Sequence, residues 1–342
     1  MTKQQWQSLV MTMWLAGLAG CAAKIPVKMT LPAETDLSRF RRVAILRFQG
    51  NGGDQLGNAL EATLMNAQVN GEPYFTLVSR DRLDQVLQEQ KLGTSGLVDD
   101  SSAARVGKVL GVDGMIAGSV NEYGTRDRQY SEVREETHDK KTYHVTYNCI
   151  ERTARIHLNT KFIDTSTTAI AMSVPLQGHG RDQDCQRAGT QLSVIDSNDM
   201  LRSATDEMFG AFARKIAPHD VVVNIELREK DDDIGFFGGG AESAKAATEH
   251  IKTGVTYAKG GNWSLAISSW EQAAQAHPNS AAAFYDIGVA YEAQGQLEKA
   301  REQYRKAAQL RAESLYVQAT GTIEKRIRDR EAVRRQTEGR PE

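Results

Sequence analysis

The stretch VLGVDGMIAGSV, residues 109–120, contains the change of periodicity that decides the fold. Its first residues end an apolar helical pattern, and Gly111 then stands where a left-handed residue commonly ends a helix. Residues 114–120 follow as a short apolar run, which is typical of a buried strand. We therefore expect a helix that leads directly into a strand of a covered sheet.

The residues before this stretch show the same alternation. Residues 42–48 and 74–78 are apolar runs that predict strands. Segments with leucines at helical spacing, residues 56–67 and 83–87, follow them and predict amphipathic helices. Strands that alternate with helices in this order predict an α/β (α+β) domain with a mixed sheet.

The residues after this stretch complete the domain. Residues 154–162 alternate apolar and polar side chains, and residues 170–174 return along the same face, so a hairpin is expected. Residues 199–216 have the spacing of a helix, and residues 221–227 read as a closing strand. We place this α/β domain at residues 39–228.

Two motifs of this domain resemble the curli-export lipoprotein family, which is called CsgG-like. They are YFTLVSR at residues 74–80 and VLGVDGMIAG at residues 109–118, and the resemblance covers roughly residues 40–225. Related periplasmic modules occur in lipoprotein activators of peptidoglycan synthases. The resemblance implies the periplasmic α/β fold more directly than a function, because the motifs are mostly structural glycines and apolar positions.

The first residues predict a lipoprotein signal peptide, residues 1–20. Lys3 precedes an apolar run of twelve residues, which is too short to span a bilayer as a helix. The run ends in LAGC, residues 18–21, which resembles the bacterial lipobox. The resemblance implies that Cys21 becomes the mature N-terminus and carries acyl chains such as palmitate. The alternative is a plain secretory signal that contains a cysteine by chance. Ala22 favours the outer membrane over retention at the inner membrane.

The composition excludes several classes of protein. The chain has 42 basic and 44 acidic residues, so no excess of positive charge points to a nucleic-acid partner. Removal of residues 1–20 takes away one base, Lys3, and no acid, which leaves 41 against 44 and a net charge of −3. No apolar stretch reaches the ~20 residues that a transmembrane helix needs.

The family's curli exporter forms a ring in which hairpins of each subunit span the outer membrane. The equivalent segment here, residues 125–141, has ten charged residues in seventeen, and they fall on both even and odd positions. A second segment, residues 178–199, is also charged. An arginine or lysine that faces lipid costs about 2–4 kcal/mol near the bilayer midplane. The sequence therefore predicts the α/β module and lipid anchor without the pore.

Two further cysteines, Cys149 and Cys185, remain after Cys21 is acylated. The periplasm is oxidising, so we expect them to form a disulfide. In the chain-entropy model a loop of this size contributes about 4 kcal/mol. Two unpaired thiols are the alternative.

The C-terminal third repeats itself at an interval of 34 residues. Small residues recur in register with aromatic ones, as in Gly254 with Gly288 and Trp270 with Tyr304. This period and pattern predict two tetratricopeptide (TPR) repeats at residues 247–314, whose groove in this class of protein binds peptides or partner proteins. The residues that carry the signature are Gly254, Tyr257, Ala266, Trp270, Ala273, Pro278, Gly288, Tyr291, Ala300, Tyr304 and Ala307.

The remaining segments are assigned as connections. Residues 21–38 are expected to be a polar tether, and the glycine-rich residues 229–246 a linker. Residues 315–342 are expected to be a capping helix and tail. Phe284 and Asp286 are weak candidates for residues that line the repeat groove.

No catalytic motif or metal site is expected. Gly50 and Gly52 follow a strand, but the rest of a dinucleotide or phosphate loop is missing, and no nucleophile elbow is present. The histidines are scattered along the chain and are better explained as surface residues than as ligands. We therefore expect no enzyme, no catalytic residue, no cofactor and no metal.

These observations predict an outer-membrane lipoprotein that faces the periplasm. Its function would be assembly of a cell-surface export or envelope complex, with a homo-oligomeric ring as one form of the assembly. Partner proteins would bind through the TPR groove. An activator of a periplasmic peptidoglycan synthase and a curli-type secretion channel subunit are the alternatives.

Overall fold

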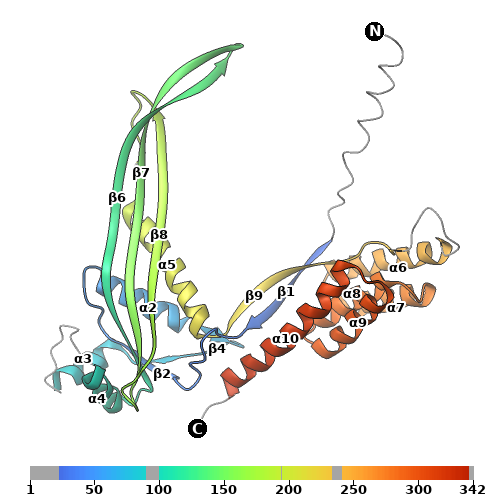
Figure 1. The fold of residues 1–342 in the computed structure, drawn as a ribbon, viewed down its shortest axis with the longest axis horizontal. Coiled ribbons are helices and arrows are strands. Elements are labelled where there is room, and N and C mark those ends of the chain that lie inside the picture. The colour runs from blue at the N-terminus through green and yellow to red at the C-terminus, as the bar shows by residue number, and fades with distance from the viewer. Residues whose placement is uncertain (1–22, 90–99, 194, 233–240, 339–342) are drawn as a thin grey trace. The chain divides into compact units, whose positions relative to one another are not determined.

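The structure is a computed structural model in which two compact units are described separately (Figure 1). The described residues are 23–89, 100–193, 195–232 and 241–338. Unit 1 comprises Met1–Met29 and Val221–Asp329, and unit 2 comprises Thr30–Asp220 and Arg330–Glu342. Cys21, the expected site of lipid attachment, lies outside the described residues.

Unit 2 is built on a mixed five-stranded sheet with the order β5-β2-β6-β7-β8. The strand β2 pairs in parallel with β5 and β6, whereas β6 with β7 and β7 with β8 are antiparallel. The strands are β2 (Arg42–Ile45), β5 (Thr76–Leu77), β6 (Gly114–His138), β7 (Lys141–Asp164) and β8 (Ile170–Arg187). This is the mixed α/β architecture that the alternation of strands and helices predicts.

Helices cover both faces of the lower part of this sheet. On one face α2 (Gly53–Met65) and α5 (Ser197–Ile216) enclose a core around Phe162. On the other face α3 (Arg80–Glu89) and α4 (Asp100–Leu110) enclose a smaller core. A short hairpin of β3 (Gln68–Val69) and β4 (Glu72–Pro73) follows α2.

Two glycines of the stretch that decides the fold have distinct roles. Gly111 has a φ of 65° just after α4, so the predicted left-handed helix end is present. Gly114 begins β6, and a Cβ there would lie 2.2 Å from the ring of Phe162. The close packing of Phe162 on the sheet therefore requires glycine at position 114.

The strands β6 and β7 are far longer than the sequence predicts. They pair from Gly114 opposite Asp164 to His138 opposite Lys141 without leaving the sheet. The sequence predicts separate strands at residues 114–120 and 154–162. The difference arises because the outer half projects beyond the covering helices, so no apolar face marks it in the sequence (Figure 1).

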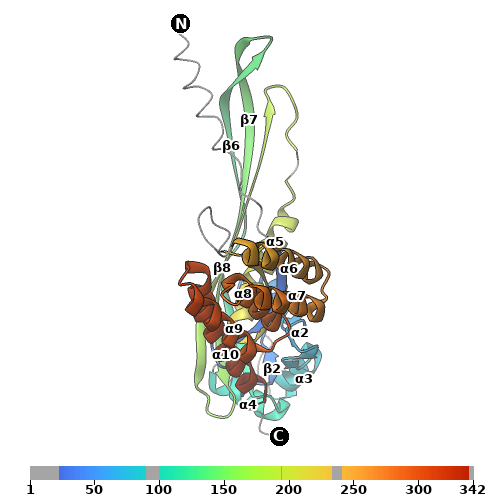
Figure 2. The same cartoon turned by 90° about the vertical axis from the view of Figure 1, so that its right-hand side faces the viewer.

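Unit 1 combines a helical stack with a two-stranded ribbon of β1 and β9. The helices form antiparallel pairs, α6 with α7 and α8 with α9, and α10 follows (Figure 2). Their bounds are β1 (Lys24–Leu31), β9 (His219–Glu226), α6 (Ala241–Lys259), α7 (Trp263–Ala276), α8 (Ala281–Ala293), α9 (Leu297–Leu310) and α10 (Ser314–Glu338). The last residues of β1 and the first of β9 belong to unit 2.

Two connecting segments differ from their expected form. Residues 24–31 of the expected tether form β1, and Ile25 is only 2% exposed. In the expected linker, Asp231 is 1% exposed, and residues 241–246 belong to α6. Both segments contain apolar or hydrogen-bonding side chains that pack against the repeat helices, which their polar composition conceals.

The last part of α10 belongs to unit 2, whereas residues 315–342 were expected to cap the repeats. Gln336 is buried and exchanges two hydrogen bonds with the backbone of Ala33, of 2.9 and 3.1 Å. Val333 packs against the core between α2 and α5. The end of α10 is therefore an integral part of unit 2.

Among the described residues, no helix has the length and apolarity that crossing a membrane requires.

We expect Gly114→Ala to destabilise unit 2, because the new methyl group overlaps the ring of Phe162. Overpacking of this kind costs about 1–3 kcal/mol of unfolding free energy. Gly124→Ala, in the same strand, is the matched control, because a Cβ at Gly124 meets no atom within 4 Å. Urea unfolding of both variants measures the difference, and equal stabilities would contradict the packing role of Gly114.

Candidate protein-interaction site

The outer halves of β6, β7 and β8 present a face that α5 does not cover. In antiparallel strands, residues directly opposite one another point to the same face of the sheet. Arg155 lies opposite both Gly124 of β6 and His179 of β8, and this row fixes the face. We call it the basic face. Its basic residues include Arg126, Arg128, Arg134, Arg155, His157, Lys161, His179, Arg181 and Arg187.

The acids on the basic face are already paired. Glu122 lies 3.5 Å from the guanidinium of Arg126, and Glu151 forms an ion pair with Arg181. Arg155 and Arg128 are exposed. The rings of His157 and His179 are edge-to-face with centroids 6.2 Å apart. The basic face thus carries an excess of positive charge on a nearly neutral chain.

The opposite face is joined to the start of α5 by Arg152. Its guanidinium donates two hydrogen bonds of 2.6 Å to the carboxylate of Asp127 and one of 2.7 Å to Ser197 Oγ. The hydrogen bond from Arg152 lowers the pKa of Asp127. This bidentate pair connects β6, β7 and the first turn of α5, so it positions the outer strands.

A pocket of about 580 Å³ lies between β8 and the start of α5, and its lining is acidic. Asp196 caps α5 by accepting hydrogen bonds from the backbone N–H groups of Asn198 and Asp199. Asp184 accepts a hydrogen bond from the backbone N–H of Ser193, and this bond lowers the pKa of Asp184. These carboxylates satisfy backbone donors, so they are explained by structure without a catalytic role.

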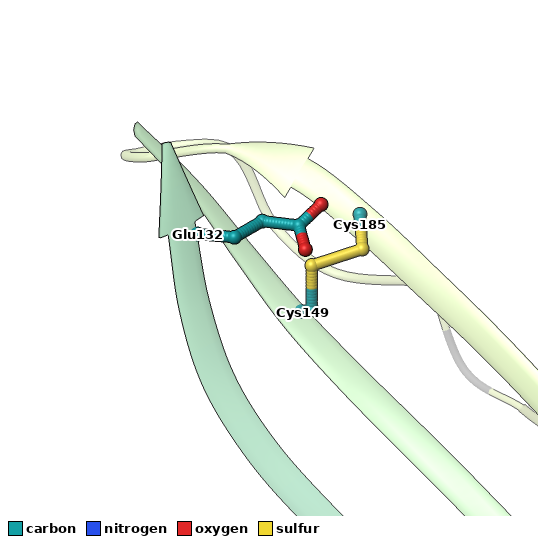
Figure 3. Close-up of side chains that lie close together, drawn as sticks. All are labelled: Glu132, Cys149 and Cys185. Atoms are coloured by element: carbon teal, nitrogen blue, oxygen red, sulfur yellow. A yellow bond between two sulfur atoms is a disulfide. The ribbon is translucent and has the colours of Figure 1, made fainter. Parts of the chain in front are cut away.

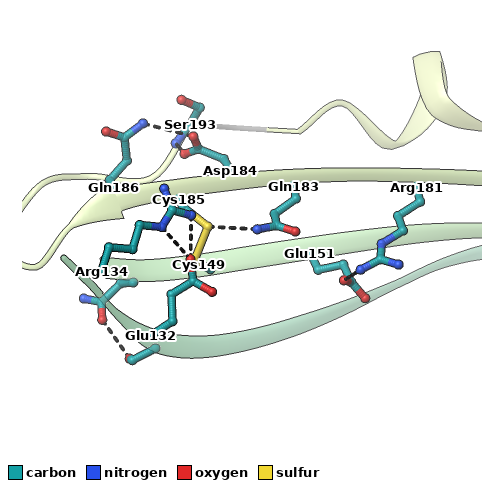
Figure 4. Close-up of a disulfide and its surroundings, with 12 residues drawn as sticks. Glu132, Arg134, Cys149, Glu151, Arg181, Gln183, Asp184, Cys185, Gln186 and Ser193 are labelled. Atoms are coloured by element: carbon teal, nitrogen blue, oxygen red, sulfur yellow. Dashed lines mark hydrogen bonds and ion pairs between the residues drawn. A yellow bond between two sulfur atoms is a disulfide. The ribbon is translucent and has the colours of Figure 1, made fainter. Parts of the chain in front are cut away.

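Cys149 and Cys185 are directly opposite each other in β7 and β8, and a disulfide joins them (Figure 3). This is the pair that the sequence analysis expects. Gln183 donates a hydrogen bond of 3.0 Å to Cys185 Sγ, and Arg134 forms an ion pair of 2.6 Å with Glu132 (Figure 4). The disulfide thereby joins β7 to the last residues of β8, two positions before the strand ends at Arg187.

The same disulfide accounts for the one group of described residues with three potential metal ligands close together. Glu132, Cys149 and Cys185 place a carboxylate oxygen and two sulfur atoms within 4.8 Å of one another. The sulfur atoms are bonded to each other, so neither is a thiolate that could bind a metal. The oxidised pair is therefore a covalent link between strands.

The TPR signature residues pack as glycine–aromatic pairs between the helices of each repeat. A Cβ at Gly254 would lie 2.3 Å from the indole of Trp270, and one at Gly288 would lie 2.7 Å from the ring of Tyr304. Trp270 Nε1 donates to the carbonyl of Ile251, and the Tyr304 hydroxyl donates to Glu292 at 2.6 Å. In each repeat the aromatic ring occupies the space that a side chain at the glycine would fill, so the two helices pack closely there.

The other signature residues surround these pairs. Tyr257 is 37% exposed, Tyr291 is half-buried, and Pro278 follows the end of α7. Four small signature residues are fully buried in the core of the repeats: Ala266, Ala273, Ala300 and Ala307.

Phe284 and Asp286 do not line an open groove. Asp286 is fully buried, and Phe284 is 8% exposed beneath the ammonium group of Lys306. Asp286 Oδ1 accepts a hydrogen bond of 2.9 Å from the backbone N–H of Arg228. The groove assignment was wrong because the chain's own segment after β9 covers this part of α8.

The sequence analysis missed two features of these sites. It did not find the basic face, because its residues come from three strands whose alignment depends on the register. It also missed the packing of residues 23–27 and 226–232 on the repeats. The alternation of Ile25, Val27 and Met29 was the available signal, and the proline between the first two obscured it.

Comparison with known proteins identifies both parts of the chain. The family model described as curli production assembly/transport component CsgG matches residues 13–206, more than half of the 342 residues. The chain belongs to the CsgG family. A tetratricopeptide repeat model matches residues 251–314 of this CsgG-family protein, so its C-terminal part carries TPR repeats. No curated protein matches the chain.

Three solved structures with some similarity to the chain come from different bacteria. The LpoB C-terminal domain from Salmonella enterica is 16% identical with a TM-score of 0.25, over 41% of this chain and 82% of that chain. A PelC dodecamer from Paraburkholderia phytofirmans is 11% identical with a TM-score of 0.26, over 57% and 99%. Lipoprotein GNA1162 from Neisseria meningitidis is 9% identical with a TM-score of 0.28, over 51% and 98%. With TM-scores this low, no property of these proteins is transferred to this chain.

Removal of the disulfide tests its contribution to the outer strands. The loop closed between Cys149 and Cys185 spans 36 residues, so the chain-entropy model predicts a loss of about 4 kcal/mol in the Cys149→Ala/Cys185→Ala variant. Differential scanning calorimetry should show a melting temperature for unit 2 lower by roughly 10 °C. Two free thiols in the untreated native protein, counted by mass spectrometry after alkylation, would refute the pairing.

Asp286 should make the stability of the repeats depend on pH. Burial raises the pKa of Asp286 well above its usual value. The folded state therefore binds the proton more tightly, and stability falls as the pH rises from the unfolded pKa through the folded one. We expect Asp286→Asn, which keeps the acceptor for the Arg228 N–H, to raise the melting temperature at pH 7.5 by about 2–4 °C and to flatten the pH profile. An unchanged profile between pH 4 and 8 would show that Asp286 does not titrate there.

Proposed function

We propose that this CsgG-family chain is a non-catalytic scaffold of the bacterial envelope, held at the outer membrane through acylated Cys21 and facing the periplasm. The lipobox-like LAGC sequence supports the anchor. The match to a model described as an assembly/transport component and the match to a tetratricopeptide repeat support an assembly role. In this proposal the chain organises an export or envelope complex and binds partner proteins through its exposed surfaces and repeats.

The basic face is the observation that carries this proposal. Seven arginine and lysine side chains lie on this face of the sheet, and the acids beside them are already paired. Arginine is enriched at protein interfaces, and a concentrated positive patch steers association with an acidic partner. The partner that this surface fits best is an acidic protein of the envelope.

The two alternative functions are an activator of a synthase and a subunit of a secretion channel. The basic face suits contact with an enzyme as well as with a structural partner, so an activator uses the same surface. The long β6–β7 hairpin is the feature that favours a channel subunit. The ten charged residues of residues 125–141 argue against it, since they occupy both faces of the hairpin.

Photo-crosslinking in cells tests the scaffold. We expect a photoreactive amino acid at Arg128 to capture an envelope protein, and the Arg126→Glu/Arg155→Glu/Arg181→Glu variant to lose that product. Each substitution reverses a charge on the basic face, so the attraction of an acidic partner becomes repulsion. Immunoblotting of the product measures the loss, with at least a tenfold decrease expected.

The matched control reverses the same number of charges elsewhere on unit 2. The Arg202→Glu/Arg214→Glu/Lys215→Glu variant changes exposed residues of α5 and should keep the crosslinked product. A Cys21→Ser variant should not incorporate a labelled fatty acid and should no longer be found in the outer-membrane fraction. Equal loss of product in both charge variants, or normal membrane fractionation of Cys21→Ser, would contradict the proposal.

A further inference from the structure

Three helices of unit 1, namely the first helix of each repeat and α10, are already in contact with another part of the same chain. These helices are α6, α8 and α10, and the contacting parts are residues 23–29, mostly in β1, and residues 226–232, which follow β9. We call these two parts the cis segment. All of the residues concerned belong to unit 1.

The apolar side of the cis segment lies in the core of the repeats. Ile25, Val27 and Leu227 are between 1% and 3% exposed and share one cluster with Ile251 of α6 and Tyr285 of α8. The backbone N–H of Leu227 donates to the carbonyl of Ala23 at 2.7 Å, so the two parts of the cis segment also bind each other. The alternating apolar side chains of an extended strand thus fill the inner side of the stack.

The polar groups of the cis segment bind all three of these helices. From α8, the Tyr285 hydroxyl donates to the carbonyl of Glu226 at 3.0 Å. From α6, Thr248 Oγ1 accepts a hydrogen bond of 3.0 Å from the backbone N–H of Asp231. From α10, the hydroxyl of Tyr316 donates to Asp232.

Two aspartates of the cis segment, Asp231 and Asp232, each contact more than one group. Asp231 is 1% exposed and lies 3.1 Å from Nδ1 of His277, at the end of α7. Asp232 forms an ion pair with Arg228 in addition to its bond from Tyr316. The surface therefore selects an extended, apolar-alternating strand together with a pair of carboxylates.

Occupation by the cis segment leaves α8 with no open side. Every residue from Ala281 to Ala290 is buried, although the residues of a helix that lined an open groove would be partly exposed. Repeat proteins bind extended peptides on such inner surfaces. A second peptide cannot occupy the same space as the cis segment, so the two must exclude each other.

We infer that the inner surface of the repeats is a peptide-binding site whose resting ligand is the chain's own cis segment, and that a partner peptide binds there only by displacing it. This inference rests on the proposed function, in which the repeats bind partners. The cis segment is linked to its site and therefore acts at an effective concentration in the millimolar range. A free partner segment competes only when it binds tightly enough to overcome this effective concentration. It needs the same chemistry as the cis segment: alternating apolar side chains and acidic residues.

A strand-replacement assay tests whether a free peptide can take the place of β1 on the repeats. The probe is a fluorescein-labelled peptide with the sequence of residues 23–31, added to the full mature chain in detergent micelles. We expect Ile25→Ser, which weakens the packing of β1, to bind the peptide at least tenfold more tightly than the unaltered chain does. Lys24→Ser is the matched control, because Lys24 is the adjacent exposed residue on the same strand. It should bind the peptide as weakly as the unaltered chain.

Two results of fluorescence anisotropy would overturn the inference. Equal binding of the peptide by all three chains would show that the site is not occluded, and no binding by Ile25→Ser would show that β1 is not a replaceable ligand. Circular dichroism verifies that each chain is folded, and Val27→Thr, of similar shape, replaces Ile25→Ser if that variant unfolds. The probe is the chain's own sequence, so failure of the crosslinking experiment leaves this result intact, and failure here leaves the crosslinking result intact.

Discussion

The antiparallel pairing of β6 with β7 runs from Gly114 opposite Asp164 to His138 opposite Lys141. At its lower end this ladder lies between two pairs of helices, and Gly114 and Phe162 hold it in the core. At its outer end the same register brings Arg126, Arg128 and Arg155 onto one face. A shift by one residue would exchange the faces and bury charged side chains beneath α5. The register therefore fixes both the core and the candidate interaction surface.

The outer strands are stabilised by specific pairs in place of an apolar core. Arg152 binds Asp127 through two hydrogen bonds, and the disulfide closes β7 to β8. Glu136 accepts a hydrogen bond from Tyr147, which lowers the pKa of Glu136, and it also forms an ion pair with Arg187. Arg128 and Arg155 remain exposed on the basic face beside these contacts.

In unit 1 the repeats and the N-terminal strand form a single core. Ala23 is only two residues from Cys21, and at about 3.5 Å per residue this leaves no more than about 7 Å of chain between them. The apolar side chains of this strand, Ile25 and Val27, share their core with the repeat helices.

Local sequence determined the elements whose signals lie close together in the chain. One such element is the end of α4 at Gly111. Another is the pair of repeats, in which Gly254 and Gly288 are 34 residues apart and each faces an aromatic ring. Helix geometry and short-range spacing account for both. Only the tertiary structure decided how far β6 and β7 extend, which arginines share a face, and that residues 23–29 and 226–232 cover α8 near Asp286. These features depend on pairing between segments that are distant in sequence, and charged or mixed side chains leave no period from which such pairing could be read.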